Sequence, residues 1–305
     1  MKKVFLIATV CFSLTGFAQQ LFDETALIEN LKFLASDSLE GRRTGTPGNS
    51  KARKYIKEQF KKLKLESLGH SNYEMPFQFS VRGEERNGVN LIGVLKGKAE
   101  SQKVLVISAH YDHVGIRDGK IYNGADDNAS GVSALFALAE YFQKNRPVHT
   151  LIFVAFDAEE MGLQGAKALV ETTKPVDQIL ANINMDMVSR ADSNQLVACG
   201  TFYYPQLKPF LEKVKEQDNI KMIFGHDDPS RFKGKENWTF SSDHGPFHSA
   251  SIPFIYFGVS DHADYHQPTD DFEKVNPTTY ISCVKLILRA VVEIDKGLPE
   301  NNGGG

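Results

Sequence analysis

Three apolar runs rich in β-branched residues end in charged side chains, and this pattern constrains the fold more than any other feature. The runs cover residues 104–110, 150–156 and 179–186, and the second continues directly into the acidic segment 157–160. Runs without alternating polar residues are typical of strands buried on both faces, as in the parallel sheets of α/β proteins. Because ligands bind such sheets at the carboxyl ends of their strands, the charged groups predict a site at that edge.

Five residues at or near this edge are candidate metal ligands: His110, Asp127, Glu160, Asp186 and His266. Imidazoles and carboxylates are hard or borderline donors, which suit zinc or manganese. A carboxylate of the turn 123–131 could bridge two ions through its two oxygens, but spacing does not decide between Asp126 and Asp127. His266 lies in a turn before the last predicted helix, from which it can reach the same edge.

Two further carboxylates beside these ligands are candidates for catalytic or supporting roles. Glu159 and Glu160 are adjacent, and neighbouring carboxylates repel each other unless a cation or a proton lies between them. One of the pair can therefore be a ligand while the other acts as a general base. Asp112 lies on the same side of its strand as His110 and could orient that imidazole or a catalytic carboxylate.

The remaining polar residues of this region give weaker indications. Asp243 and His244 could line the site or begin a helix. Isolated histidines are common surface residues, and four of them receive no role in this interpretation: His113, His226, His248 and His262.

The rest of the chain predicts alternating helices and strands. Helices are expected at residues 24–36, 50–64, 131–145, 162–170, 205–217 and 277–296. Further strands are expected at 73–81, 89–95, 195–198 and 252–257, and the Gly- and Arg-rich segment 37–49 is expected to be a loop packed near the site. No internal repeat or interior linker is present. The sequence therefore predicts a single α/β domain of three layers, with a mixed, mostly parallel central sheet flanked by helices.

The first eighteen residues are predicted to be a secretory signal peptide. Lys2 and Lys3 precede an apolar run, and residues 16–18 place small side chains at the two positions that a signal peptidase recognises. The run is too short to span a membrane. A lipid anchor on Cys11 is the alternative, and the bulky residue before it disfavours that processing. We expect an exported protein, periplasmic or secreted, with a catalytic domain at 19–297 and a flexible tail at 298–305.

The charge of the chain argues against nucleic-acid binding, and its few cysteines allow at most one disulfide outside the signal peptide. Loss of the signal peptide removes two lysines and no acids, so the formal net charge changes from −3 to −5. The chain has no block of five or more basic residues, so nucleic acid is not an expected partner. The two cysteines outside the signal peptide, Cys199 and Cys283, could form one disulfide or remain buried free thiols.

Five sequence blocks, taken in order, resemble the dizinc aminopeptidases of metallopeptidase family 28. They are HYDHVG, GADDNASG, DAEEMGLQG, NMDMVS and YHQPTDD, and the earlier LEGRRTGTPGN is similar to the N-terminal region of the same family. The resemblance extends over residues 37–296 and is of the secreted bacterial leucyl aminopeptidase and aminopeptidase Y type. It implies the fold of a zinc-dependent exopeptidase.

The resemblance also implies two zinc ions per chain. Asp127 matches the bridging carboxylate because it is the second acid of its turn. One zinc would be held by Asp127, Glu160 and His266, and the other by Asp127, Asp186 and His110.

Three other residues match catalytic positions of the family. Glu159 matches the general base, Asp112 the acid near His110, and Tyr265 a tyrosine that can stabilise the oxyanion. The implied reaction is hydrolysis of the first peptide bond of a substrate with a free N-terminus, by a metal-activated water that gives its proton to Glu159. We expect the enzyme to be a monomer that acts on peptides.

Three alternatives to an aminopeptidase remain open at this point. A glutaminyl-peptide cyclase of the same fold would use one working zinc and would not hydrolyse its substrate. Carboxypeptidase-type specificity also occurs in the family. A non-catalytic binding domain, such as a receptor ectodomain, would be expected to lack a ligand or Glu159, and neither is lacking here.

Overall fold

The computed structural model describes residues 20–68, 72–99, 102–172 and 178–299. The predicted signal peptide and most of the predicted tail, residues 300–305, lie outside these ranges.

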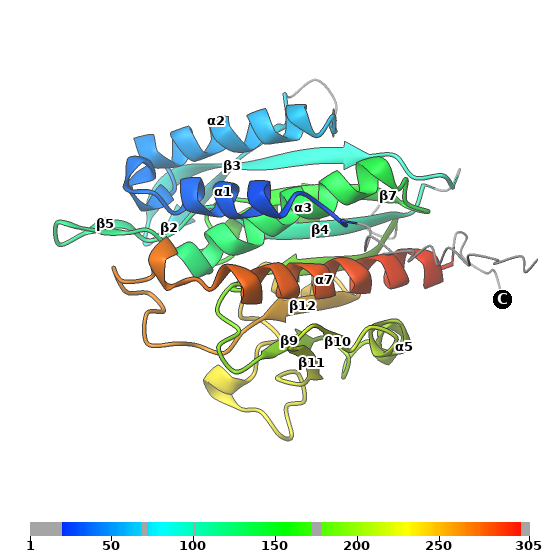
Figure 1. Cartoon of the computed structure of the whole chain (residues 1–305). Helices are drawn as coiled ribbons and strands as arrows, with labels where there is room; N and C mark the ends of the chain where they lie inside the picture. Colours follow the sequence, from blue (N-terminus) through cyan, green and yellow to red (C-terminus); the bar gives the residue numbers. More distant parts are fainter. Residues whose placement is uncertain (1–19, 69–71, 100–101, 173–177, 300–305) are drawn as a thin grey trace, which may run out of the picture.

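A ten-stranded mixed sheet forms the middle layer of the molecule (Figure 1). The strand order is β1-β3-β7-β4-β8-β12-β9-β11-β10, with β2 paired to β3. Four adjacent central strands run parallel to one another and form a parallel block: β7, β4, β8 and β12. The bounds are β1 Glu66–Ser67, β2 Glu74–Val81, β3 Glu84–Leu95, β4 Val104–His110, β7 Thr150–Phe156, β8 Ile179–Met185, β9 Gln195–Cys199, β10 Glu216–Gln217, β11 Ile220–Phe224 and β12 Phe254–Gly258.

Helices cover both faces of the sheet, which gives three layers. Figure 1 shows α1 (Glu24–Leu34), α3 (Gly131–Lys144) and α7 (Pro277–Gly297) side by side in front of the strands. Their apolar faces share one core with α2 (Pro47–Lys62). On the other face, α4 (Gln164–Thr172) and α6 (His244–Ser249) pack against a second core that includes Phe156 and Phe247. The predicted fold class is confirmed.

The remaining elements are short. They are η1 Asp37–Arg42, β5 Gly115–Arg117, β6 Lys120–Tyr122, η2 Ala125–Ser130, η4 Pro205–Leu207, α5 Lys208–Glu212, η5 Gly234–Glu236 and η6 Phe272–Lys274. Strands β5 and β6 form a separate two-stranded sheet.

Local sequence explains where the long elements begin. Helix α2 starts at Pro47, three residues earlier than expected, because the Thr46 side chain accepts the backbone N–H of Asn49 and a proline suits the first helical turn. Asn276 caps α7 in the same way, ahead of Pro277. Each apolar run of the sequence became a strand of the parallel block.

One predicted helix is wrong. The segment 205–217 was expected to be a single helix, but α5 ends at Glu212 and the chain then forms the hairpin β10–β11. Asp218 lies in the turn with φ of 51°, a left-handed conformation that aspartate tolerates better than most residues. Strand β11 was not expected from the sequence, whereas α6 begins at Asp243 and His244, where a helix start was one of two alternatives.

Cys199 and Cys283 are both buried free thiols, so they do not form a disulfide with each other. Across the described ranges, no helix combines the length and the apolar character that crossing a membrane requires.

Candidate metal centre

The parallel block brings the predicted ligands to one edge of the sheet. His110 is the last residue of β4, Asp186 directly follows β8, and Glu159 and Glu160 follow β7. Strand β4 lies between β7 and β8, so the three carboxyl ends are neighbours. Asp127 lies in η2, the turn that precedes α3, and its own backbone is not helical, with φ of −102° and ψ of 94°.

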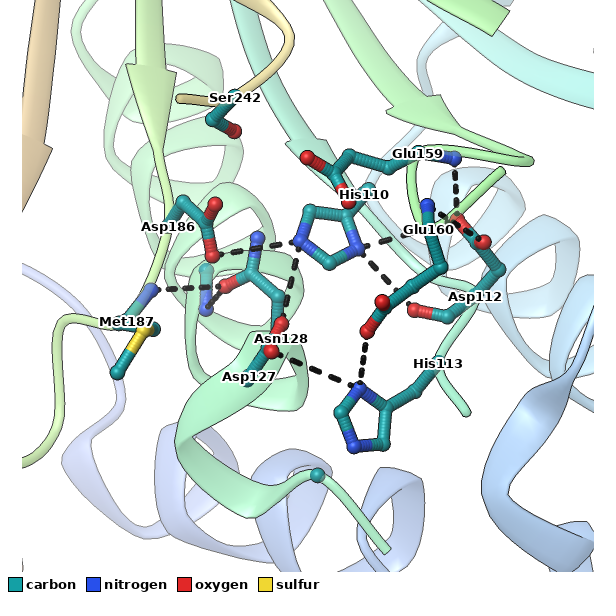
Figure 2. Close-up of polar contacts among 12 residues, drawn as sticks. His110, Asp112, His113, Asp127, Asn128, Glu159, Glu160, Asp186, Met187 and Ser242 are labelled. Atoms are coloured by element: carbon teal, nitrogen blue, oxygen red, sulfur yellow. Dashed lines mark hydrogen bonds and ion pairs between the residues drawn. The ribbon is translucent and has the colours of Figure 1, made fainter. Parts of the chain in front are cut away.

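Three of the predicted ligands form a first cluster. His110 Nε2 lies 3.3 Å from Asp127 Oδ1 and 3.3 Å from Asp186 Oδ1, and all three side chains are buried (Figure 2). The other ring nitrogen, Nδ1, lies 3.1 Å from the backbone carbonyl oxygen of Asp112 and 3.8 Å from its carboxylate. The carbonyl oxygen of Asp112 therefore orients the imidazole more directly than the acid does.

A second cluster forms on the other oxygen of Asp127. His266 Nε2 lies 3.0 Å from Asp127 Oδ2 and 3.3 Å from Glu160 Oε1. His113 Nδ1 lies 2.8 Å from Glu160 Oε1 and 3.7 Å from Asp127 Oδ2. The structure thus brings all five predicted ligands together and adds His113, to which the sequence analysis assigned no role.

The spacing of these atoms fits zinc. Tetrahedral zinc with bonds of about 2.0–2.1 Å holds its ligand atoms about 3.3 Å apart. The His110 contacts to Asp127 and Asp186 are both 3.3 Å, and the His266 contacts are 3.0 and 3.3 Å. Glu160 Oε1 is buried and has no hydrogen-bond partner within the described part of the chain. A cation between these groups would satisfy atoms that the protein alone leaves unpaired.

The turn before α3 presents Asp127, and not Asp126, to the clusters. Asp126 Oδ1 accepts hydrogen bonds from the backbone N–H and the hydroxyl of Ser189 at 2.7 and 2.8 Å, and Oδ2 lies 3.1 Å from His262 Nε2. The Asp270 carboxylate accepts the backbone N–H groups of both acids at 3.1 Å. Asp270 was not among the residues predicted from the sequence, although the acid pair in YHQPTDD is a signal for it.

Asp112 holds the segment that carries the adjacent glutamates. Its Oδ1 accepts the backbone N–H of Glu159 at 3.0 Å and its Oδ2 that of Glu160 at 3.3 Å. The two glutamate side chains then diverge: Figure 2 shows the Glu160 carboxylate facing His113, while that of Glu159 lies beside His110.

Burial and the charges of the site shift the pKa values of its carboxyl groups in opposite directions. Burial, together with the charges of Asp243 and other acids, raises the pKa of Glu159 well above its ordinary value. Burial also acts to raise the pKa of Asp127, but the imidazoles of His113, His110 and His266 outweigh it and hold that pKa well below the ordinary value. Burial and Asp127 act against ionisation of Glu160, yet His113 and His266 lower its pKa to about 2. Asp127 and Glu160 are therefore ionised, as ligands must be.

Backbone conformation also marks the edge as unusual. Ala158, Met187 and His266 have φ values of 58°, 57° and 53°, in the left-handed region that non-glycine residues seldom adopt. Such conformations concentrate at functional sites, where the surrounding structure holds them in place.

The N-terminal segment 37–49 packs against the site, as expected. The buried guanidinium of Arg42 donates to the carbonyl oxygens of Tyr111 at 2.9 Å, Asn123 at 2.6 Å and Gly124 at 3.0 Å, and also to that of Leu34. One side chain thereby joins the loop after β4 to the loop before η2. Because of burial, the pKa of Arg42 is lowered to about 10.

A pocket of about 370 Å³ opens over the first cluster. Its floor includes Glu159 and Asp186, and Tyr265 lines it with its ring stacked on His266 at a centroid distance of 4.1 Å. The rest of the wall combines apolar or aromatic side chains with polar and charged ones. The first group is Met187, Trp238, Tyr256 and Val259, and the second is Lys235, Asn237, Ser241 and Asp261.

Asp243 and His244 lie at the start of α6 and are fully buried. Asp243 makes no side-chain cap, and neither of its carboxylate oxygens has a hydrogen-bond partner in the described structure. Burial is the main cause that raises the pKa of Asp243 to about 7, and the charge of Asp186 adds to it.

Comparison with known proteins gives a family and a fold. The sequence model of peptidase family M28 matches residues 90–291. Aminopeptidase YwaD from Bacillus subtilis is 29% identical over 223 residues, which are 68% of this chain and 45% of that protein. The chain spans about half the length of the curated relatives it matches.

Many solved structures share the fold, and two of them are of particular interest. BSAP, a zinc aminopeptidase from Bacillus subtilis, has a TM-score of 0.72 and 17% identity, over 92% of this chain and 98% of that chain. Glutaminyl cyclase from Porphyromonas gingivalis has a TM-score of 0.72 and 16% identity, over 89% of this chain and 98% of that chain. At these identities the likeness concerns the fold alone. The family model, in contrast, covers more than half of the sequence, and the chain therefore belongs to peptidase family M28.

Proposed function

We propose that this protein is a zinc-dependent aminopeptidase that binds two zinc ions and hydrolyses the N-terminal peptide bond of peptides. The observation that carries the proposal is the division of Asp127 between two clusters: Oδ1 faces His110, and Oδ2 faces His266. A carboxylate with one oxygen toward each cluster has the arrangement needed to bridge two ions. Zinc held there would supply the positive charge that acidifies water and polarises a substrate carbonyl.

Glu159 is the proposed general base. Its carboxylate lines the pocket beside the first cluster, while Asp112 holds its backbone N–H. The raised pKa in the absence of metal reflects burial among other acids, so bound cations would favour the ionised, proton-accepting form. Glu159 would take a proton from the attacking water and return it to the leaving amine. Tyr265, on the pocket wall, would donate a hydrogen bond to the developing oxyanion.

The pocket supports action on the end of a peptide. A volume of about 370 Å³ is near the lower end of the range for small-ligand sites, so it suits a terminal residue better than a long stretch of chain. Its acidic members would favour a substrate amine: Asp127, Glu159, Asp186 and Asp261. Phe247 and Phe254 are near the site segments in the sequence, but both are buried in the core. The apolar part of the pocket wall includes Met187, Trp238 and Val259.

The test compares leucine p-nitroanilide with its N-acetylated form on zinc-loaded protein. We expect hydrolysis of the free amine only, because acetylation removes the charge that the acidic pocket would pair with. Equal rates on both substrates would contradict the amine-anchored mechanism. Release of ammonia from Gln-initiated peptides, with no peptide bond cleaved, would favour the cyclase alternative.

Export and a monomeric state complete the proposal. The basic start and the small residues at 16–18 support cleavage after Ala18, with a mature chain that begins at Gln19. The intact mass of the exported protein tests this, and a chain that still carries Met1 or a lipid on Cys11 would contradict it. Sedimentation of the mature protein tests the monomer.

A further inference from the structure

His113 lies in the second cluster without the partners that a buried histidine normally has. Its side chain is 0% exposed, and neither ring nitrogen forms a hydrogen bond within the described ranges. Buried polar side chains almost always form hydrogen bonds, so an imidazole that forms none and lies beside two carboxylates has the surroundings of a metal ligand. Figure 2 shows its ring nitrogen facing both Glu160 and Asp127.

The fold makes room for the ring at this place. Gly124 has φ of 56°, and a Cβ there would lie 2.5 Å from the Cδ2 atom of His113 and 2.0 Å from the carbonyl oxygen of Asp127. Any side chain at position 124 would therefore displace the imidazole. Arg42 holds this stretch in place, because its guanidinium donates a hydrogen bond to the carbonyl oxygen of Gly124 at 3.0 Å.

Four donor atoms converge at this point. One atom each from His113, Asp127, Glu160 and His266 lies within 4.8 Å of all the others. The contacts of His113 Nδ1, 2.8 Å to Glu160 and 3.7 Å to Asp127, bracket the separation of about 3.3 Å expected between ligands of tetrahedral zinc. Neither His113 Nδ1 nor Glu160 Oε1 has a hydrogen-bond partner in the described structure, and their 2.8 Å separation is compatible with two ligands of one ion.

We propose that His113 is a fourth protein ligand of the metal held by Asp127, Glu160 and His266. This inference rests on the proposed zinc binding. The two metal positions then have different numbers of protein ligands, because the described residues supply three to the other position: His110, Asp127 and Asp186. Four protein ligands close a tetrahedral zinc site, and three leave a position open for water or substrate. The open position is the one beside Glu159 and the pocket.

The substitution His113→Phe removes both nitrogens and keeps a ring of similar volume. We expect one zinc to bind as in the wild type and the other to bind about 100-fold or more weakly, since even residues that only support a ligand can cost 10–100-fold. Competition with a chromophoric chelator measures both affinities. His248→Phe is the matched control, because that imidazole contacts Tyr204 and not the clusters.

X-ray absorption of the wild-type dizinc protein gives a readout without any substitution. Three imidazoles shared by two ions are expected if His113 binds, and two if it does not. Thermal unfolding of metal-free His113→Phe measures any loss of packing separately from the loss of a ligand.

The outcomes are distinguishable. Two unchanged zinc affinities in His113→Phe, with two imidazoles in the wild type, would overturn the ligand role and leave the proposed function intact. Wild-type protein that binds no zinc would overturn the proposed function itself. A weakened second site and three imidazoles would support the inference.

Discussion

Asp112 holds Glu159 through its backbone, with the carboxylate Oδ1 3.0 Å from the N–H of that residue. The contact ties the end of β4 to the segment after β7, and it fixes the position from which the proposed base acts. Asp112→Asn would replace one of the two carboxylate oxygens by an NH₂ group. One of the backbone N–H groups of Glu159 and Glu160 would then lose its acceptor. We expect kcat to fall about 10–100-fold with bound zinc retained, measured by kinetics and metal analysis. The exposed Asp118→Asn is the control, and unchanged kcat in Asp112→Asn would contradict the role.

Substitutions of the adjacent residues Glu159 and Glu160 should have different effects on kcat and on zinc affinity. Glu159→Gln removes the proposed base, so we expect kcat to fall about 10²–10⁴-fold while both zinc ions stay bound. Glu160→Gln removes a proposed ligand, so zinc affinity should fall first. Zinc titration of both variants, beside kcat, separates the two effects. Equal zinc loss in both would mean that the roles are assigned wrongly.

Asp126 and Asp127 form a second matched pair. Asp127→Asn should weaken both zinc sites, because each of its oxygens faces a different cluster. Asp126→Asn should leave zinc stoichiometry unchanged and lower the free energy of unfolding by about 1–3 kcal/mol, since its contacts are with Ser189 and His262. Metal analysis and urea unfolding distinguish these outcomes. Zinc loss in Asp126→Asn alone would reverse the assignment.

Arg42 should be important for stability without contacting the ligands. Arg42→Met would leave several buried carbonyl oxygens without their donor, and we expect the free energy of unfolding to fall by about 2–5 kcal/mol. Arg42→Lys should rescue little, because one ammonium group cannot reproduce the planar set of donors. A shift in the urea midpoint with an unchanged slope is the expected signature. A midpoint within error of the wild type would contradict this role.

The pair His149–Asp295 should make stability depend on pH. The imidazole and carboxylate lie 3.1 Å apart, and the hydrogen bond with Asp295 is the main cause that raises the pKa of His149 above its ordinary 6.5. A group whose pKa is raised on folding stabilises the folded state fully at a pH below its unfolded-state pKa. That contribution is lost as the pH rises through its folded-state pKa. In metal-free protein, His149→Gln should therefore cost more stability at a pH just below 6.5 than at an alkaline pH above the raised pKa. An equal cost at both ends would contradict the ion pair.

The strands that carry the site were predictable because each is a continuous apolar run. The expected ranges 104–110 and 150–156 equal the bounds of β4 and β7. The hairpin at β10–β11 was not predictable from helical periodicity, because Asp218 and Asn219 end the periodic pattern with a turn. Short elements depend on such single residues, whereas long buried strands depend on many.

The ligand set was predictable only in part. Strand ends and family resemblance bring five residues together, but the direction of the His113 side chain depends on the turn after Asp112 and on the space beside Gly124. The only signal in the sequence is a histidine three positions after His110, immediately beyond a strand end. Asp270 is a similar case, because its contacts with the turn of Asp127 join segments more than 140 residues apart.

The contacts of Arg42 limit how far the chain can be shortened without loss of activity. Residues 90–291 contain every proposed ligand and the proposed base, so they look like a sufficient minimal unit. Yet a protein trimmed to that segment would lack the guanidinium that joins the two ligand-bearing loops, and also Asp295, which accepts the N–H of His149 at the start of β7. We expect the shortest active chain to begin before α1 and to end after α7, so the boundaries of the family match are not those of the folding unit.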